Sequence, residues 1–251
     1  MTTVSPPRPR LDPDAKGGLR LTLAAFGGLL VAVPFALVLL LVVDHWGPLQ
    51  RLDHSVASNL NGFAYKHATY VSAMRALCDI VSPADFELVA LMVGVVLLVR
   101  RQPRLATWLL VTVYGGGLLS TLVKLAVDRK RPFVEHPVAH AMSASFPSGH
   151  ALGVLVGTGA LLLVGLPFVN RRMRPVLIGL GVLLVLAVGY SRLGLGVHYL
   201  SDVLGGYLLG AGWLALTTAA FSAWRRDRGR PDRPVTQGLE PSAPERKGPQ
   251  Q

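Results

Sequence analysis

Six long apolar runs constrain this chain more than any other feature of its sequence. The first, Leu21–Val43, contains no charged residue and is long enough to cross the ~30 Å hydrocarbon core of a bilayer. A signal peptide would have a shorter apolar stretch and a small-residue cleavage site, so we interpret this run as a retained anchor helix. The other five predicted spans cover about 83–99, Leu105–Val127, Gly149–Val169, Pro175–Tyr190 and Tyr199–Phe221. The predicted fold is an all-α, polytopic membrane protein with a six-helix transmembrane bundle.

The composition supports this fold class. Hydrophobic residues make up 51% of the chain and charged residues only 16%, whereas a soluble domain usually has about 25% charged residues. The single cysteine, Cys78, excludes an internal disulfide and the usual cysteine zinc cluster. The polar, proline-rich ends, 1–20 and 224–251, are predicted to be disordered cytoplasmic tails around one domain over 21–223.

The net charge of +11 would suggest a nucleic-acid partner in a soluble protein. In a membrane protein the positions of the basic residues matter more. With the N-terminus inside, the inside segments hold 17 Lys and Arg residues and the outside segments hold 8, which agrees with the positive-inside rule. We therefore expect no nucleic-acid partner, a plasma-membrane location and two cytoplasmic termini.

The segments between the spans are less regular. Residues 63–80 carry apolar residues on roughly one face, which predicts either an amphipathic helix at the interface or an ordinary helix packed on the bundle. Gly115–Gly117 predicts close helix packing. Trp46 and Tyr199 are predicted to be interfacial anchors.

Chemistry-bearing residues gather where the predicted topology places the outer face. Lys124, Arg131 and Arg192 are three cations near the membrane, where unpaired charges are expensive. Together they suit one anionic group such as a phosphate monoester. Ser148 and Gly149 open the predicted fourth span, and the free N–H groups of a helix N-terminus also favour phosphate.

Two histidines and an aspartate accompany these cations. His198 and Asp202 are four residues apart, so a helix places them on one face, where the carboxylate can orient the imidazole. His150 is a second histidine that could protonate a leaving oxygen. Each residue alone has a simpler structural explanation, but together they indicate phosphoryl transfer through a histidine nucleophile without a metal.

The sequence resembles the type 2 phosphatidic-acid phosphatases, which share their motifs with class A acid phosphatases and vanadium haloperoxidases. The family pattern is Lys-x6-Arg-Pro, Pro-Ser-Gly-His and Ser-Arg-x5-His-x3-Asp. The chain matches it at Lys124 to Pro132, Pro147 to His150 and Ser191 to Asp202. The resemblance implies that His198 is the nucleophile, that Asp202 orients it and that His150 is the general acid and then the base. It also implies that the phosphoryl oxygens bind to Lys124, Arg131, Arg192, Ser148 and Gly149.

The resemblance implies a lipid phosphate or lipid pyrophosphate as substrate, hydrolysed at the extracytoplasmic face without a cofactor. A lipid phosphotransferase and a non-catalytic anion-binding membrane protein are the alternatives. Arg129 and Lys130 are interpreted as a solvated or headgroup-facing pair, with a second phosphate site as the alternative. A metal site at Glu135, His136 and His140 is a further alternative that we do not favour, because ligand spacing in a loop says little.

Overall fold

The computed structural model describes residues 31–226, and this part of the chain is helical without a strand. The predicted tail 1–20, the start of the first predicted span and residues 227–251 lie outside the described residues, whereas 224–226, predicted to be part of the second tail, continue the last helix. After a first helix, Val31–Val43, the elements are α2 (Gly47–Lys66), α3 (Ala68–Ile80), α4 (Pro83–Val99), α5 (Pro103–Val127), α6 (Gly149–Gly165), a short 3-10 turn (Leu166–Phe168), α7 (Arg174–Gly194) and α8 (Leu200–Arg226).

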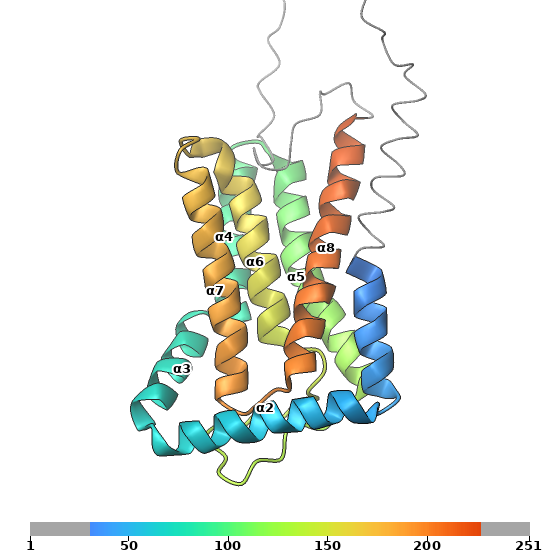
Figure 1. Cartoon of the computed structure of the whole chain (residues 1–251). Helices are drawn as coiled ribbons and strands as arrows, with labels where there is room; N and C mark the ends of the chain where they lie inside the picture. Colours follow the sequence, from blue (N-terminus) through green and yellow to red (C-terminus); the bar gives the residue numbers. More distant parts are fainter. Residues whose placement is uncertain (1–30, 227–251) are drawn as a thin grey trace, which may run out of the picture.

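The helices α4 to α8 stand side by side, with the Val31–Val43 helix beside α8 (Figure 1). Five stretches are long and apolar enough to cross a membrane: Ala68–Val99, Pro103–Val127, Gly149–Phe168, Arg174–Gly194 and Leu200–Ser222. The Val31–Val43 helix and α2 together count as a sixth if the bent pair forms one span. The all-α membrane bundle predicted from the sequence is confirmed.

Helix α2 lies across one end of the bundle (Figure 1). It turns by 88° from the Val31–Val43 helix, and Pro48 suits its first turn because the missing N–H of proline needs no partner there. Its buried side chains are Asp53, Ala57, Asn61 and Ala64, which recur at helical spacing and form one face. The predicted single helix over 63–80 is wrong, because the chain leaves helical geometry at His67 (φ −131°, ψ 80°) between α2 and α3.

Helix α6 is the centre of the bundle and contacts α4, α5, α7 and α8. Small residues allow these contacts to be close. Gly157 lies against Phe86 of α4, and a Cβ added at Gly115 would come within 2.6 Å of Trp213 of α8. The expectation of close packing at Gly115–Gly117 is confirmed.

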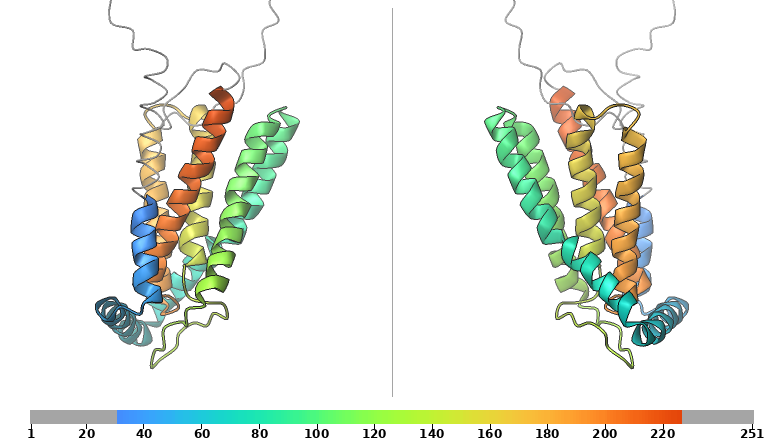
Figure 2. Two further views of the ribbon diagram at one scale, coloured as in Figure 1. Left: turned by 90° about the vertical axis from the view of Figure 1, so that its right-hand side faces the viewer. Right: turned by 90° about the vertical axis from the view of Figure 1, so that its left-hand side faces the viewer.

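Four helix ends meet at the end of the bundle that α2 covers. The side views in Figure 2 show the loop 128–148 at this same end, below α5. Helix α5 ends there at Asp128, which adopts left-handed geometry (φ 43°), and α6 begins after its N-cap Ser148. Helix α7 continues to Gly194, so Ser191 and Arg192 belong to its last turn and not to the glycine-rich link expected after Tyr190. The three predicted motifs are thereby brought to one end of the molecule.

Candidate active site

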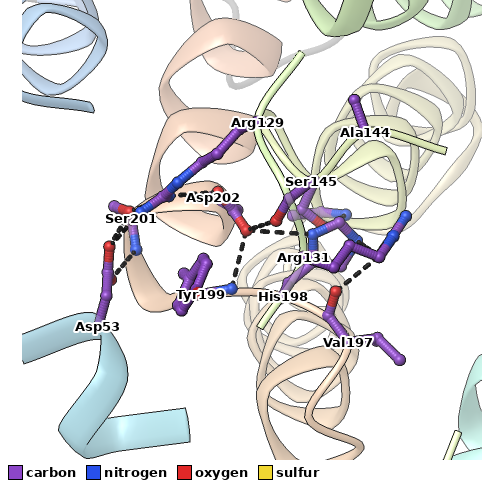
Figure 3. Close-up of polar contacts among 12 residues, drawn as sticks. Asp53, Arg129, Arg131, Ala144, Ser145, Val197, His198, Tyr199, Ser201 and Asp202 are labelled. Atoms are coloured by element: carbon purple, nitrogen blue, oxygen red, sulfur yellow. Dashed lines mark hydrogen bonds and ion pairs between the residues drawn. The ribbon is translucent and has the colours of Figure 1, made fainter. Parts of the chain in front are cut away.

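Asp202 is a buried carboxylate that accepts three hydrogen bonds at this end of the bundle. It is fully buried in the first turn of α8. Its Oδ2 accepts hydrogen bonds from the Tyr199 N–H (2.8 Å) and from the Ser145 hydroxyl, and its Oδ1 accepts one from Arg129 Nη1 (2.6 Å; Figure 3). Charge-assisted hydrogen bonds of this kind fix a carboxylate in one orientation.

His198 lies immediately before α8 and is only 2% exposed. Its Nδ1 is 3.4 Å from Asp202 Oδ2, close but outside hydrogen-bond geometry, as is common for catalytic pairs before substrate binds. Its Nε2 is 3.3 Å from Arg131 Nη1 (Figure 3). Because a guanidinium can only donate, Nε2 is the unprotonated nitrogen and Nδ1 carries the proton that faces Asp202.

The surroundings keep this imidazole neutral. Burial, together with the positive charges of Arg131 and Arg192, lowers the pKa of His198 to about 4, although Asp202 opposes the shift. The lone pair on Nε2 is therefore available across the neutral pH range. A neutral imidazole with one free nitrogen has the form that a nucleophile requires.

Two of the predicted cations bond to neighbouring carbonyls of the loop 128–148. Lys124 Nζ donates to the Ala144 carbonyl (2.5 Å). Arg131 donates to the carbonyls of Ser143 (2.7 Å) and Val197 (2.6 Å), which holds its guanidinium beside His198. Burial and the neighbouring charge of Arg192 lower the pKa of Arg131, although the Asp202 carboxylate opposes the shift, so the cations of the site repel one another.

Arg192 completes this group of cations from the last turn of α7. Its Nε is buried and has no hydrogen-bond partner within residues 31–226. A buried donor without a partner is rare in native structures, and this nitrogen is available to donate to a bound group. An anion with several acceptor oxygens would satisfy this nitrogen and relieve the repulsion among the three cations.

The start of α6 supplies the remaining predicted residues. Ser148 caps the helix by accepting a hydrogen bond from the Ala151 N–H (3.4 Å), and its own N–H donates to the Asp202 carbonyl (2.9 Å). Gly149 faces Lys124, since a Cβ added there would lie 3.7 Å from Lys124 Cε. His150, the second residue of α6, is close enough to His198 and to the three cations to feel their electrostatic influence. All eight predicted residues therefore lie in one cluster.

Arg129 is placed differently from the sequence prediction. It is not a solvated or headgroup-facing charge: only 13% of its side chain is exposed, and it bridges two fully buried carboxylates. One arm of the guanidinium meets Asp202 and the other meets Asp53 Oδ2 at 2.8 Å (Figure 3). Burial alone would lower the pKa of Arg129, but the two carboxylates outweigh it and raise that pKa. Lys130 is exposed, as expected.

Tyr199 is not the interfacial anchor that the sequence suggested. It is 7% exposed, and its ring centroid lies 4.4 Å from Arg129 Cζ, in a cation–π contact.

Sequence reasoning also missed Asp53, which lies in a segment without a motif. The signal that could have revealed it is the small and polar face of α2, in which Asp53, Ala57, Asn61 and Ala64 recur at helical spacing.

The loop residues considered for a metal have other roles. The His136 ring stacks on Tyr65 with centroids 3.9 Å apart, and its backbone N–H and carbonyl both bond to the Asn61 side chain. Within residues 31–226 no three His, Cys, Asp or Glu side chains converge as a metal site would require.

Comparison with known proteins identifies the family. The model of the PAP2 superfamily matches residues 105–226. Decaprenylphosphoryl-5-phosphoribose phosphatase of Mycobacterium tuberculosis is 35% identical over 153 residues, which cover 57% of this chain and 76% of that protein. The chain belongs to the PAP2 superfamily. The resemblance inferred from the three motifs is thus confirmed.

Other relatives are also named as membrane-lipid phosphatases. Phosphatidylglycerophosphatase B of Bacillus subtilis is 41% identical over 41% of this chain and 54% of its own length. Undecaprenyl-diphosphatase BcrC of the same organism is 38% identical over 38% of this chain and 47% of its own length. This chain thus spans about half the length of these two PAP2 relatives. The solved transmembrane PAP2 phosphatidylglycerolphosphate phosphatase from Bacillus subtilis shares the fold, with a TM-score of 0.69 at 23% identity over 82% of this chain and all of that one.

Proposed function

We propose that this protein is a membrane phosphatase that hydrolyses a lipid phosphate monoester or lipid pyrophosphate through a phosphohistidine. The observation that carries the proposal is the arrangement around His198. Its Nε2 faces Arg131, and its Nδ1 lies 3.4 Å from Asp202, at a position where burial keeps the ring neutral. The names of the relatives, which are all phosphatases acting on lipid phosphates, support the same activity.

In the first step, the phosphoryl group of the substrate enters among Lys124, Arg131 and Arg192 and replaces the contact between Arg131 and Nε2. The Nε2 lone pair forms a bond to phosphorus as the bond from phosphorus to the leaving oxygen breaks. His150, whose protonated form the bound phosphoryl anion stabilises against the neighbouring cations, donates its proton to that oxygen. Asp202 stabilises the positive charge that develops on the imidazole, because it faces the Nδ1–H.

In the second step, His150 is left without its proton and accepts one from water. The resulting oxygen attacks phosphorus, the bond from Nε2 to phosphorus breaks, and inorganic phosphate is released. The enzyme returns to its starting protonation state. No step calls for a metal, since the cations of the protein offset the charge of the transferring group.

The substrate class follows from where the site lies. The catalytic residues come from the ends of apolar helices, so a headgroup can reach them while its tail stays in the bilayer. The residues of the cluster recognise phosphate and not a particular lipid. Phosphatidic acid, phosphatidylglycerol phosphate and polyprenyl diphosphates are therefore the candidates, and the relatives' names include two of these three chemistries.

The first experiment is a phosphate-release assay on purified protein in detergent. The panel contains phosphatidic acid, phosphatidylglycerol phosphate, a polyprenyl diphosphate and a soluble monoester, with and without a lipid alcohol as acceptor. We expect wild type to release phosphate and His198→Ala to release none, while His140→Ala, an exposed loop histidine, keeps wild-type activity. Phosphate release by His198→Ala would refute the mechanism, and a phosphorylated acceptor in place of free phosphate would indicate a transferase.

The charge distribution along the chain favours cytoplasmic termini and an extracytoplasmic site in the plasma membrane. Single cysteines test this orientation in a Cys78→Ser background. Met142, in the loop beside the site, is fully exposed, and Met173, between α6 and α7 at the other end, is 49% exposed. A membrane-impermeant maleimide added to intact cells should label Met142→Cys and leave Met173→Cys unlabelled until lysis. The reverse pattern would refute the orientation.

A further inference from the structure

We infer that Asp53 of α2, through Arg129, is a positioning residue for the Asp202–His198 pair, and this inference rests on the proposed function. Asp53 lies outside the region matched by the PAP2 model, residues 105–226. It is nevertheless fully buried, and its Oδ2 bonds to the same guanidinium that holds Asp202.

The geometry gives Asp53 two routes to the nucleophile. The first is the Arg129 fork, whose two arms reach Asp53 at 2.8 Å and Asp202 at 2.6 Å. The second is Ser201, the residue before Asp202. Its N–H donates to Asp53 Oδ1 (3.0 Å) and its hydroxyl to Asp53 Oδ2 (2.5 Å), while Arg129 also donates to that hydroxyl (2.7 Å). The first turn of α8 is thereby attached to α2.

The charges explain why a second carboxylate is needed. If Arg129 faced Asp202 alone, the guanidinium would neutralise the carboxylate that must stabilise a positive imidazole. With Asp53 present, the buried group of two carboxylates and one guanidinium keeps a net charge of −1 beside His198. Such preorganised charge is effective in a site with little water.

Helix α2 is held firmly enough to serve as this support. Asn61, on the same buried face as Asp53, bonds to both the N–H and the carbonyl of His136 at 3.2 and 2.7 Å. The loop that carries Arg129 and Arg131 is therefore attached to α2 at two separate points. A surface helix thus fixes both the phosphate-binding loop and the orienting carboxylate.

The test is Asp53→Asn in the full-length protein. Asparagine keeps the shape and one acceptor oxygen, and Arg129 retains Asp202, so no buried charge is left unpaired. We expect kcat to fall by about 10- to 100-fold, while KM and the inhibition constant of inorganic phosphate stay within about twofold. These binding constants depend on Lys124, Arg131 and Arg192, none of which contacts Asp53. The matched control is Asp79→Asn, an exposed carboxylate on α3, which should retain wild-type kcat.

Each outcome decides the inference. A kcat within twofold of wild type, or an equal loss of kcat and phosphate binding, overturns it. If Asp53→Asn yields no folded protein, Arg129→Lys replaces it, because this variant keeps every charge while a lysine cannot reproduce the fork that reaches both carboxylates. A lower kcat at unchanged KM then supports the inference, and an unchanged kcat overturns it. Wild type and His198→Ala are assayed in the same experiment. An inactive wild type refutes the proposed function. An active wild type together with wild-type kcat in Asp53→Asn refutes this inference alone.

Discussion

Gly206 offers a sharp test of how α6 and α8, the helices that carry the proposed catalytic residues, are held together. It lies in α8, one turn after Asp202, against the start of α6. A Cβ added at Gly206 would lie 2.6 Å from the Ser148 carbonyl oxygen and 3.1 Å from the Ala151 Cβ, whereas ordinary van der Waals contact begins at 3.4 Å. Gly206→Ala therefore forces α6 and α8 apart by about 0.8 Å, since a backbone atom is in the way.

This separation acts directly on the site. His150 belongs to α6, whereas Asp202 belongs to α8 and His198 precedes it. The link between the two helix ends, from the Ser148 N–H to the Asp202 carbonyl, is 2.9 Å long and would stretch beyond hydrogen-bond length. A misplacement of about 1 Å can cost about 100-fold in rate, so we expect kcat to fall by about 10- to 100-fold. Overpacking should also cost about 1–3 kcal/mol of stability.

Substitutions at two other glycines serve as controls for Gly206→Ala. A Cβ at Gly210, one turn further along α8, would lie 3.3 Å from the Leu152 carbonyl oxygen, so Gly210→Ala should reduce kcat by less than about threefold. Gly165, in α6, has nothing within 4 Å of such a Cβ, and Gly165→Ala should be at least as active and stable as wild type. The assay is phosphate release at saturating substrate, with thermal unfolding of each variant. A Gly206→Ala enzyme with wild-type kcat would refute the reasoning.

Three further predictions concern the chemistry of the site. Arg131→Lys should lower kcat/KM by about tenfold or more, because a lysine cannot reproduce the forked guanidinium contacts to Ser143, Val197 and phosphate. Steady-state kinetics that match wild type would contradict this prediction. Activity should persist in excess EDTA, and a loss that Mg²⁺ restores would count against the mechanism. The pKa of His198, lowered to about 4, means that the unfolded chain binds more protons than the folded one between about pH 4 and 6.5. Stability should therefore fall as pH drops through that window, and thermal midpoints at pH 7 and 5 should differ more for wild type than for His198→Gln.

The local features of the site were predictable because they depend on near neighbours in the sequence. The N-cap role of Ser148 follows from a small polar residue before an apolar run, and the structure places it there. The proximity of His198 and Asp202 follows from their spacing of four residues, although His198 lies just before α8 and not within it. Helix lengths were less predictable. The fifth span was expected to end at Tyr190, but α7 continues to Gly194, and no helix-ending residue lies between these two positions to show where it stops.

The break at His67 and the burial of Tyr199 were not predictable in the same way. The apolar pattern continues across residues 63–80, but the helix changes direction where α2 leaves the end of the bundle and α3 turns toward α7. Tyr199 resembles an interfacial tyrosine because it follows a polar link. Its actual surroundings, Arg129 and His54, come from segments 70 and 145 residues earlier.

The sequence by itself determined that this chain crosses a membrane repeatedly and that it carries the three motifs of the PAP2 superfamily. Apolar run length and motif spacing are sufficient for this, because both concern residues close together in the chain. Only the tertiary structure decided that Arg129 is an internal bridge and that Asp53 is its second partner. The residues that flank a charged loop residue do not reveal which distant residue forms an ion pair with it. The partner 76 residues away is defined only when α2 folds back across the bundle and excludes water from both carboxylates.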